Sequence, residues 1–197
     1  MFNHDVKGGF FSNKADAASK NPTNPEADLF SILDQLETYR GSDGNFRFKL
    51  CYPELTWGVD GGKCNEWIQS SNPLTETTIT GFKSISLAFT MNSRKDPWVG
   101  LGKSQWPESV IDDTAITFGW FAIGSNKAYY GGVPGPRYSV DSQANTFGTV
   151  KKIQLYVQDK DRTSSGNDID KPKEEKNVSF SFRMSVCNKF KSFDMET

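Results

Sequence analysis

Histidine, the side chain that most often moves protons at neutral pH, occurs only once in this chain, as His4. A serine or cysteine nucleophile needs such a base within hydrogen-bond reach and held in an accurate position. Residues 1–23 mix glycine, asparagine, lysine and proline, and predict an irregular arm with one or two helical turns. Because a mobile arm is a poor place for a base, we expect no nucleophile–histidine centre.

Carboxylates are the next residues that could do chemistry, because a pair of them can divide acid and base roles. Asp112 and Asp113 are adjacent, and such neighbours point to opposite faces of a strand or cap a turn, which is the better interpretation here. Glu54, Glu66 and Asp60 could still meet across a cleft, as the acids of a glycosidase do, although nothing in their spacing favours this. The sequence predicts a non-catalytic protein and leaves such a hydrolase as an open alternative.

Cofactor-binding patterns are equally weak. No GxGxxG or GxxxxGK[ST] loop occurs, and the nearest segment, GVPGPRY, contains prolines that lack an N–H donor. Asp43 and Asp60 lie beside glycines in GSDGN and WGVDGG, where calcium ligands could converge, but such steps more often form hairpin turns. We expect neither a metal nor another cofactor.

Three cysteines, Cys51, Cys64 and Cys187, are wrongly spaced for a closed zinc site. If the protein is secreted, a Cys51–Cys64 disulfide could close a short loop, leaving Cys187 unpaired, buried or intermolecular. Asn177 begins an Asn-Val-Ser glycosylation sequon, which favours secretion. The start, MFNHDVKGGFF, contains no signal peptide, so the chain is either intracellular or begins at a mature or cloned boundary.

Aromatic residues in or beside glycine-rich loops are candidates for binding, because exposed rings can stack on sugars or anchor a protein partner. Trp67 and Trp120 fit a packed core better. The predicted contact residues are Trp57, Trp98, Trp106, Tyr129 and Tyr130.

The elements that must position these residues are mainly strands. Alternating apolar residues predict half-exposed strands at 46–52, 83–89 and 152–158. Residues 116–124, apolar on both faces, predict a covered central strand. One amphipathic helix is expected at 25–39, capped by Asn24, with apolar residues at helical spacing. Those residues are Leu29, Ile32, Leu33 and Leu36.

The end of the chain separates from the rest. Residues 158–177 are charged and almost free of apolar side chains, so they predict a flexible loop or linker. Residues 178–187 then alternate Val, Phe, Phe, Met and Val with polar residues, which predicts a strand within a C-terminal segment, 178–197. This strand could fold back on its own sheet or pair with a neighbouring molecule.

Composition sets the class of the protein. The 197 residues suit one domain, expected at 1–157, and 13% are aromatic, which is enough for a sizeable core. Alanine and leucine are sparse, whereas glycine, serine, threonine, asparagine and phenylalanine are abundant, which favours strands and turns. We expect a mostly β fold, an antiparallel jelly-roll-like β-sandwich. The net charge of −1 gives no reason to expect nucleic-acid binding, and no apolar run is long enough to span a membrane.

A resemblance extends these expectations. The runs LFSILDQLETYRGSDGNFRFKLCYPEL, CNEWIQSSNPLTETTITGF, VGLGKS, WFAIGS, VPGP and VKKIQLYV resemble an uncharacterised family of extracellular β-rich domains of marine invertebrates such as cnidarians, sponges and lancelets. The similarity covers roughly residues 4–157. It implies a secreted or matrix-associated protein and no catalytic residue.

Two functions fit these observations. The first is a structural or adhesive extracellular matrix protein that self-associates, as a homo-oligomer or matrix assembly, through sheet edges or its last strand. The alternative is a glycan-binding, lectin-like module that uses the loop aromatics, with or without calcium.

Overall fold

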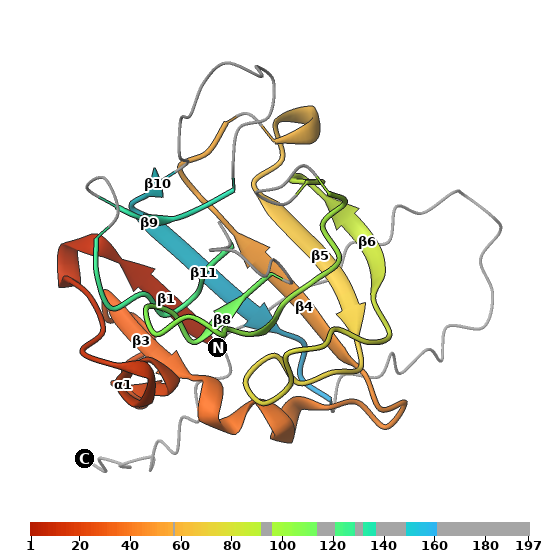
Figure 1. The fold of residues 1–197 in the computed structure, drawn as a ribbon, viewed down its shortest axis with the longest axis horizontal. Coiled ribbons are helices and arrows are strands. Elements are labelled where there is room, and N and C mark those ends of the chain that lie inside the picture. The colour runs from red at the N-terminus through yellow and green to blue at the C-terminus, as the bar shows by residue number, and fades with distance from the viewer. Residues whose placement is uncertain (57, 92–95, 114–120, 129–131, 137–148, 161–197) are drawn as a thin grey trace, which may run out of the picture.

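The computed structural model describes residues 1–56, 58–91, 96–113, 121–128, 132–136 and 149–160, and in these ranges the protein is mostly β. Seven strands form one antiparallel sheet in the order β2-β3-β1-β11-β4-β5-β6 (Figure 1). Their bounds are Phe2–Asp5 (β1), Ser19–Lys20 (β2), Leu29–Ile32 (β3), Phe46–Cys51 (β4), Cys64–Gln69 (β5), Lys83–Leu87 (β6) and Lys152–Val157 (β11). The predicted mostly β class and antiparallel pairing are confirmed.

A second layer covers one face of this sheet. It contains two short antiparallel pairs: β7 (Gly102–Lys103) with β8 (Ile111–Asp112), and β9 (Val133–Pro134) with β10 (Thr149–Val150). β8 and β9 cross in front of the sheet in Figure 1. Trp67 of β5 contacts Trp98 of this layer with ring centroids 4.8 Å apart, and Trp98 contacts Phe121 at 5.3 Å. The aromatic core therefore lies between the large sheet and the loops in front of it.

The strands at 46–52 and 152–158 form as their alternation predicts. Phe46, Phe48 and Leu50 of β4 are fully buried, while Arg47 and Lys49 between them are half-buried on the other face. β11 shows the same alternation, and its residues 154–157 pair with β4. A period of two places every second side chain on the core-facing side, so these two strands form the centre of the sheet.

The predicted helix at 25–39 is wrong. Leu29–Ile32 is the strand β3, and only Leu33–Tyr39 is helical, as a 3₁₀ helix. Phe2 of β1 lies opposite Ser31, so tertiary pairing captures a short apolar run whose spacing also fits a helix. Leu33 and Leu36 remain buried because residues three apart share one side of a 3₁₀ helix.

Helical structure is otherwise limited, in the described ranges, to α1 (Lys14–Ala18) and two three-residue 3₁₀ turns, Val6–Gly8 and Val59–Gly61. α1 is the short helical segment expected within the first 23 residues. None of the helices in these ranges is long and apolar enough to cross a lipid bilayer.

The prediction of an irregular N-terminal arm is also wrong. β1 lies inside the large sheet, between β3 and β11, and His4 pairs with Ile153 and Leu29. Its four residues are too few and too polar to give a strand pattern in the sequence. Pairing on both sides, which no local pattern shows, makes them part of the core.

His4 is completely buried among aromatic rings, with Phe10 and Phe11 in edge contact. Its Nε2 donates to the Gly9 carbonyl at 3.1 Å, whereas its Nδ1 is buried without a hydrogen-bond partner. Protonation would place a second N–H, with a charge, in this apolar site. Burial accordingly lowers the pKa of His4 to about 4, although the Gly9 bond and Asp5 act in the opposite direction.

This pKa predicts a pH-dependent stability. Between pH 6.5 and 4 the unfolded chain binds a proton at His4 that the folded chain excludes, so the free energy of unfolding falls as the pH falls, by about 3 kcal/mol in total. A His4→Gln variant should lose this contribution. Urea unfolding of both proteins at pH 7, 5.5 and 4 measures it, and the buried Met1 amine, with a pKa of about 5, affects both equally. Parallel stability curves for the two proteins would contradict the assignment.

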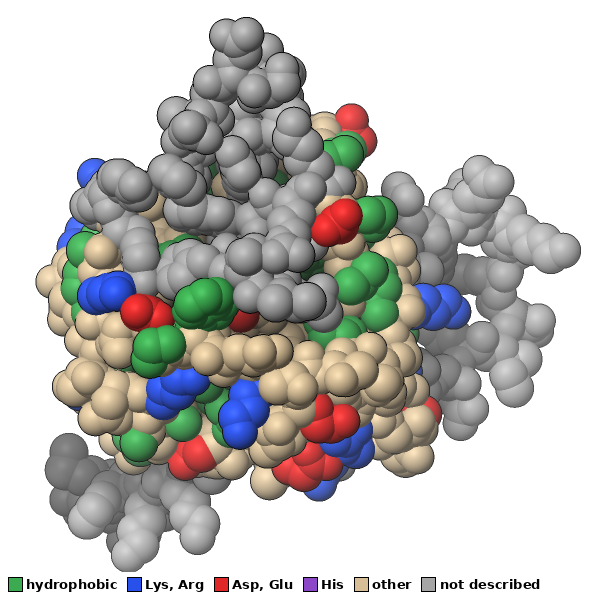
Figure 2. All heavy atoms as spheres, viewed as in Figure 1, with side chains coloured by type: hydrophobic (Ala, Val, Ile, Leu, Met, Phe, Trp, Pro, Cys, Tyr) green, Lys and Arg blue, Asp and Glu red, His purple; other side chains and the backbone are tan. Residues whose placement is uncertain are grey.

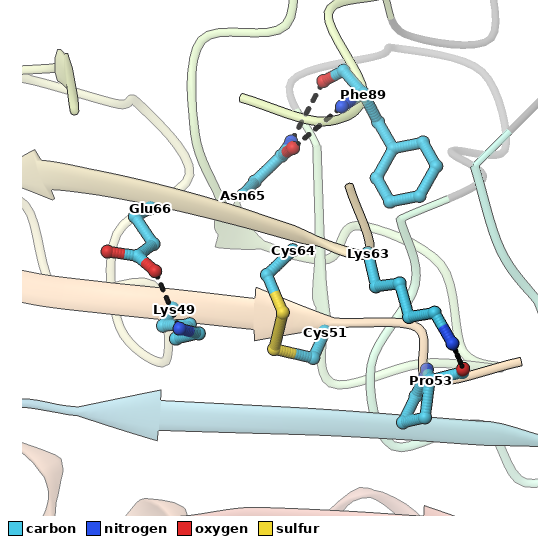
Figure 3. Close-up of a disulfide and its surroundings, with 8 residues drawn as sticks. All are labelled: Lys49, Cys51, Pro53, Lys63, Cys64, Asn65, Glu66 and Phe89. Atoms are coloured by element: carbon cyan, nitrogen blue, oxygen red, sulfur yellow. Dashed lines mark hydrogen bonds and ion pairs between the residues drawn. A yellow bond between two sulfur atoms is a disulfide. The ribbon is translucent and has the colours of Figure 1, made fainter. Parts of the chain in front are cut away.

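Cys51 of β4 and Cys64 of β5 lie opposite each other and form a disulfide (Figure 3). At the next pair, the Tyr52 N–H donates to the Lys63 carbonyl, so the cysteines occupy a non-hydrogen-bonded position, where opposing Cα atoms approach most closely. Their Cα atoms are 4.1 Å apart. The bond fixes the register of the hairpin where its loop leaves the sheet.

Reducing this disulfide should destabilise the fold. The cysteines are 13 residues apart, and opening a loop of that size raises the entropy of the unfolded chain enough to lower the free energy of unfolding by about 3 kcal/mol. Urea unfolding of a Cys187→Ala protein, oxidised and reduced, measures the effect without competing thiol exchange. An unchanged midpoint after reduction would show that the bond contributes nothing.

Candidate functional site

The four large hydrophobic side chains that are most exposed in the described residues lie on β6 or on segments bonded to the chain that follows it. Ile85 belongs to β6, the edge strand, and the others lie beside the chain that continues from it. Val59 is 54% exposed, Ile85 38%, Met91 43% and Val99 38%. Figure 2 shows hydrophobic side chains at the surface on the right of the view, where Figure 1 places β6. We call these four residues the β6 surface.

A β-bulge gives Ile85 its exposure. Ser86 pairs with Glu66 and Ser84 pairs with Trp67, so Ile85 is the additional residue of β6 with no opposite number on β5. Bulges at sheet edges redirect a side chain and interrupt the ladder. The predicted strand at 83–89 is thus shorter than expected, and its exposed part presents an apolar side chain to solvent.

Inward-facing side chains of β5 position the segment that carries Met91 and Val99. Asn65, Trp67 and Gln69 alternate along this strand and all three are completely buried. A buried amide must be hydrogen-bonded, because leaving its donors and acceptors without partners costs several kcal/mol. Asn65 and Gln69 meet this requirement by holding the backbone of the chain that follows β6.

Asn65 clamps Phe89. Its Nδ2 donates to the Phe89 carbonyl at 2.9 Å and its Oδ1 accepts from the Phe89 N–H at 2.8 Å (Figure 3). Beside it, the Val59 N–H donates to the Ala88 carbonyl at 2.8 Å. A Cβ at Gly58 would lie 2.0 Å from the Gly62 carbonyl oxygen and 2.9 Å from the Ala88 Cβ. Glycine at position 58 therefore lets this loop lie against Ala88. These bonds set Val59 beside the end of β6.

Gln69 holds the chain at Leu101. Its Nε2 donates to the Leu101 carbonyl at 2.8 Å and its Oε1 accepts from the Leu101 N–H at 3.2 Å. The Trp67 indole N–H donates to the same Oε1 at 2.7 Å. Gly100, with a φ of +103°, passes too close to this amide for any side chain. Val99 therefore lies two residues before Leu101, whose backbone is hydrogen-bonded to Gln69 in the core.

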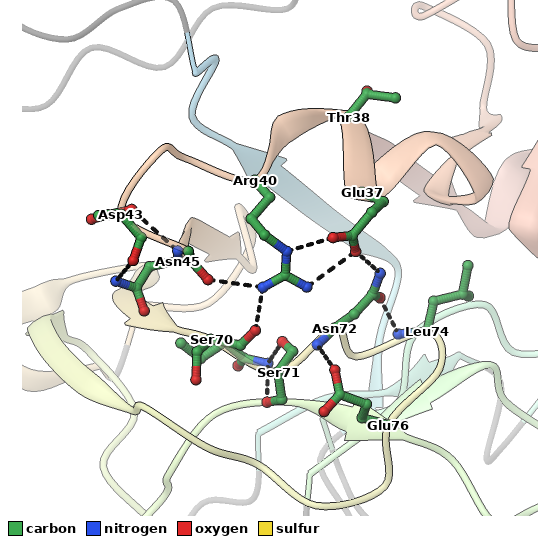
Figure 4. Close-up of polar contacts among 12 residues, drawn as sticks. Glu37, Thr38, Arg40, Asp43, Asn45, Ser70, Ser71, Asn72, Leu74 and Glu76 are labelled. Carbon is green, nitrogen blue, oxygen red and sulfur yellow. Dashed lines mark hydrogen bonds and ion pairs between the residues drawn. The ribbon is translucent and has the colours of Figure 1, made fainter.

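Hydrogen bonds of Arg40 hold the chain directly after β5 in place (Figure 4). Arg40 donates to both carboxylate oxygens of Glu37 and to the Ser70 carbonyl, and its guanidinium lies 4.2 Å from the centre of the Phe46 ring. Asn72 Nδ2 also donates to Glu37, at 2.8 Å. Hydrogen bonding to Arg40 lowers the pKa of Glu37, which keeps the carboxylate charged.

Trp98 is not a contact residue, although the sequence predicted it as one. It is 2% exposed and its ring contacts Trp67, Phe82 and Phe121. Tryptophan buries more apolar area than most side chains, and a position beside glycines does not distinguish a loop on the surface from one folded onto a core. Trp67 is fully buried, as expected.

Of the two predicted contact residues that the structure describes, Trp98 is buried and Trp106 is partly exposed. It is half-buried at the tip of the β7–β8 hairpin, where its N–H donates to Ser104 Oγ at 3.2 Å. Several other predictions lie outside the described residues, as does all of 161–197. They concern Trp57, Tyr129, Tyr130, Trp120, Asn177, Cys187, most of the strand at 116–124, most of the linker at 158–177 and the strand at 178–187.

The acids considered for catalysis or calcium are dispersed. Glu66 pairs with Lys49 at 2.6 Å, Glu54 accepts a bond from the Lys151 N–H, and Arg47 holds the pKa of Asp43 at about 2. Asp112 and Asp113 are buried, with Asp112 in β8, so the prediction of a turn there is wrong; the apolar residues before them draw the segment into the core. In the described ranges no three potential metal ligands come together.

Comparisons with protein-family models, curated proteins and solved structures found no match to this chain. The resemblance to invertebrate extracellular domains stays a hypothesis. The β6 surface was not predicted, although NEWIQ, with amides at alternate positions of a predicted strand, was the available signal. Inward-facing amides on a strand indicate that a neighbouring backbone must come close.

The Asn65 clamp makes a direct prediction. Asn65→Leu keeps the volume but leaves both polar backbone groups of Phe89 without their side-chain partner, which should lower the free energy of unfolding by about 2–4 kcal/mol. Gln154→Leu, an amide on the opposite, half-buried face of the sheet, should change it by less than about 0.5 kcal/mol. Urea unfolding measures both changes. Equal effects would show that the Asn65–Phe89 hydrogen bonds contribute no more to stability than an amide on the half-buried face.

Proposed function

We propose that this chain is a non-catalytic, extracellular structural or adhesive domain that self-associates through the β6 surface. The observation that carries the proposal is the exposure of Val59, Ile85, Met91 and Val99, which lie on the edge strand β6 or on segments bonded to the chain that follows it. Exposed apolar side chains that are grouped, rather than scattered, are typical of protein interaction sites. The backbone beneath them is anchored, so the surface is formed before binding.

The partner that fits best is the segment 178–187 of a second copy. Its apolar residues recur at every second position, so as a strand it offers one continuous face of Val178, Phe180, Phe182, Met184 and Val186. The four residues that define the β6 surface are apolar, as are the five residues of this face. The bulge at Ile85 interrupts the outer edge of β6, so side-chain packing, rather than a continuous strand ladder, dominates the proposed contact.

Chain length permits this exchange. The charged residues 158–177 separate the segment from β11, and about 20 residues can extend over several tens of ångströms. A linker this polar gains little by folding on its own, so it can lead the segment to a neighbouring molecule. Association of this kind is concentration-dependent and, repeated head to tail, can build an open assembly.

The extracellular location is part of the same proposal. A disulfide on the sheet is typical of oxidising compartments, and the sequon at Asn177 and the resemblance to invertebrate matrix domains favour the same setting. We also propose the jelly-roll-like sandwich as the finer description of the fold, with the layer that contains β7–β10 as its second sheet.

Sedimentation of four proteins tests the association. The full chain should form dimers or larger species at micromolar concentration, whereas a chain ending at residue 160 and the Ile85→Lys variant should remain monomeric at the same concentrations. Gln35→Lys, which adds the same charge at an exposed position away from β6, should behave as the full chain does.

Two results would overturn the proposal. One is a full chain that is monomeric at every concentration, which would favour a terminal strand folded on its own sheet. The other is undiminished association of Ile85→Lys, which would place the contact elsewhere. Circular dichroism of each variant separates loss of association from loss of fold.

A further inference from the structure

The hairpin tip that carries Trp106 gathers positive charge from three separate segments. Lys103 lies in β7, Lys14 comes from α1, and Lys127 comes from the loop that follows Ser125. Glu108 is the acid among them. We call Trp106, the three lysines and Glu108 the Trp106 cluster; the chain as a whole carries a net charge of −1.

Hydrogen bonds hold the cluster together around Ser104. The Lys14 ammonium donates to the Ser104 carbonyl at 3.1 Å, and the Trp106 N–H donates to Ser104 Oγ. Ser109 Oγ donates to the same hydroxyl at 2.8 Å. Lys14 and the Trp106 backbone are therefore fixed to one residue, and α1 is tied to the hairpin across 90 positions of sequence.

Glu108 partly balances the lysines. Its Oε1 accepts from the Lys127 ammonium at 2.8 Å, and its Oε2 is buried without a hydrogen-bond partner. The hydrogen bond from Lys127 lowers the pKa of Glu108, and the charge of Lys14 acts in the same direction. The pKa of Lys14 is lowered first by partial burial and then by the charge of Lys103, which indicates that the two ammonium groups repel each other across the cluster.

We propose that the Trp106 cluster binds an acidic sugar, with the ring of the sugar against the indole and its carboxylate or sulfate group among the lysines. An anion at the cluster is attracted to Lys14 and Lys103, whose charges oppose each other, and to Lys127, which Glu108 holds close by. A half-buried indole provides a flat apolar surface that suits the C–H face of a pyranose. A neutral sugar could lie against the indole but offers the lysines no anion. An acidic peptide offers an anion but no pyranose ring for the indole.

This site is separate from the β6 surface. It is formed by α1, the β7–β8 hairpin and the loop at 125–128, and none of its residues belongs to the proposed self-association contact. A matrix protein with both sites could associate with itself and hold an acidic polysaccharide at the same time. Failure of either proposal leaves the other intact.

Isothermal titration of the full chain tests the proposal with four probes: a sulfated hexasaccharide, a uronic-acid hexasaccharide without sulfate, a neutral hexasaccharide and a short poly-glutamate peptide. Binding to one or both acidic sugars is expected, with an affinity that falls as salt concentration rises. The two acidic probes show which anionic group is preferred. Equal binding of the neutral sugar, or of poly-glutamate, would overturn the assignment.

Variants identify the residues. Trp106→Ala should weaken binding of the better acidic sugar about tenfold. Lys103→Gln should weaken it about two- to fivefold, and Glu108→Gln should tighten it by a similar factor. Lys63→Gln is the matched control, because Lys63 is an exposed lysine whose ammonium donates to the Pro53 carbonyl on another loop.

The sign of the Glu108 effect separates a binding site from general charge attraction. A Lys63→Gln loss as large as that of Lys103→Gln, or a Glu108→Gln variant that binds no more tightly, would overturn the proposal. Because Trp106→Ala could disturb the hairpin, Trp106→Phe is measured with it. Phenylalanine should retain most of the affinity, and thermal unfolding shows that each variant is folded.

Discussion

The structure depends on the need of two buried amides for hydrogen bonds. Asn65 and Gln69 point inward from β5, where apolar residues would ordinarily lie, and each takes both polar groups of one backbone residue, Phe89 and Leu101. Loss of the hydrogen bonds of one such amide should lower the free energy of unfolding by about 2–4 kcal/mol, a large share of a typical net stability of about 5–15 kcal/mol. The chain between 89 and 101 is consequently held at both ends against the sheet. Trp98 fills the space between the two anchors, against Trp67.

This constraint has a consequence at the surface. A segment tied down through its backbone does not need all its side chains for packing, so Met91 and Val99 can face outward without loosening the fold. The bulge at Ile85 and the glycine-dependent approach of Val59 to Ala88 add to the same exposed region. The proposed association site is thus the outer side of a segment whose backbone is anchored by Asn65 and Gln69 on its inner side, an arrangement that favours a rigid contact surface.

The proposed sugar site follows a different principle, the convergence of like charges from distant segments. Lys14 reaches Ser104 from α1, and Lys127 reaches Glu108 from a third segment. Like charges brought together by a fold attract anions, and Glu108 is one such anion among the described residues. Taken together, the two proposals describe a module that joins copies of itself at one surface and holds acidic sugar at another, which would connect protein and polysaccharide in one material.

The sequence by itself determined the strands with a clear period of two, β4 and β11, and the burial of Trp67, because alternation and apolar area act locally. It also allowed the pairing of Cys51 with Cys64. Only the tertiary structure decided that β1 enters the sheet, that 29–32 is a strand rather than a helix, and that Trp98 lies in the core. Each of these outcomes depends on partners far away in the chain. The β6 surface and the Trp106 cluster are of the same kind, since side chains meet there only after the sheet has placed them.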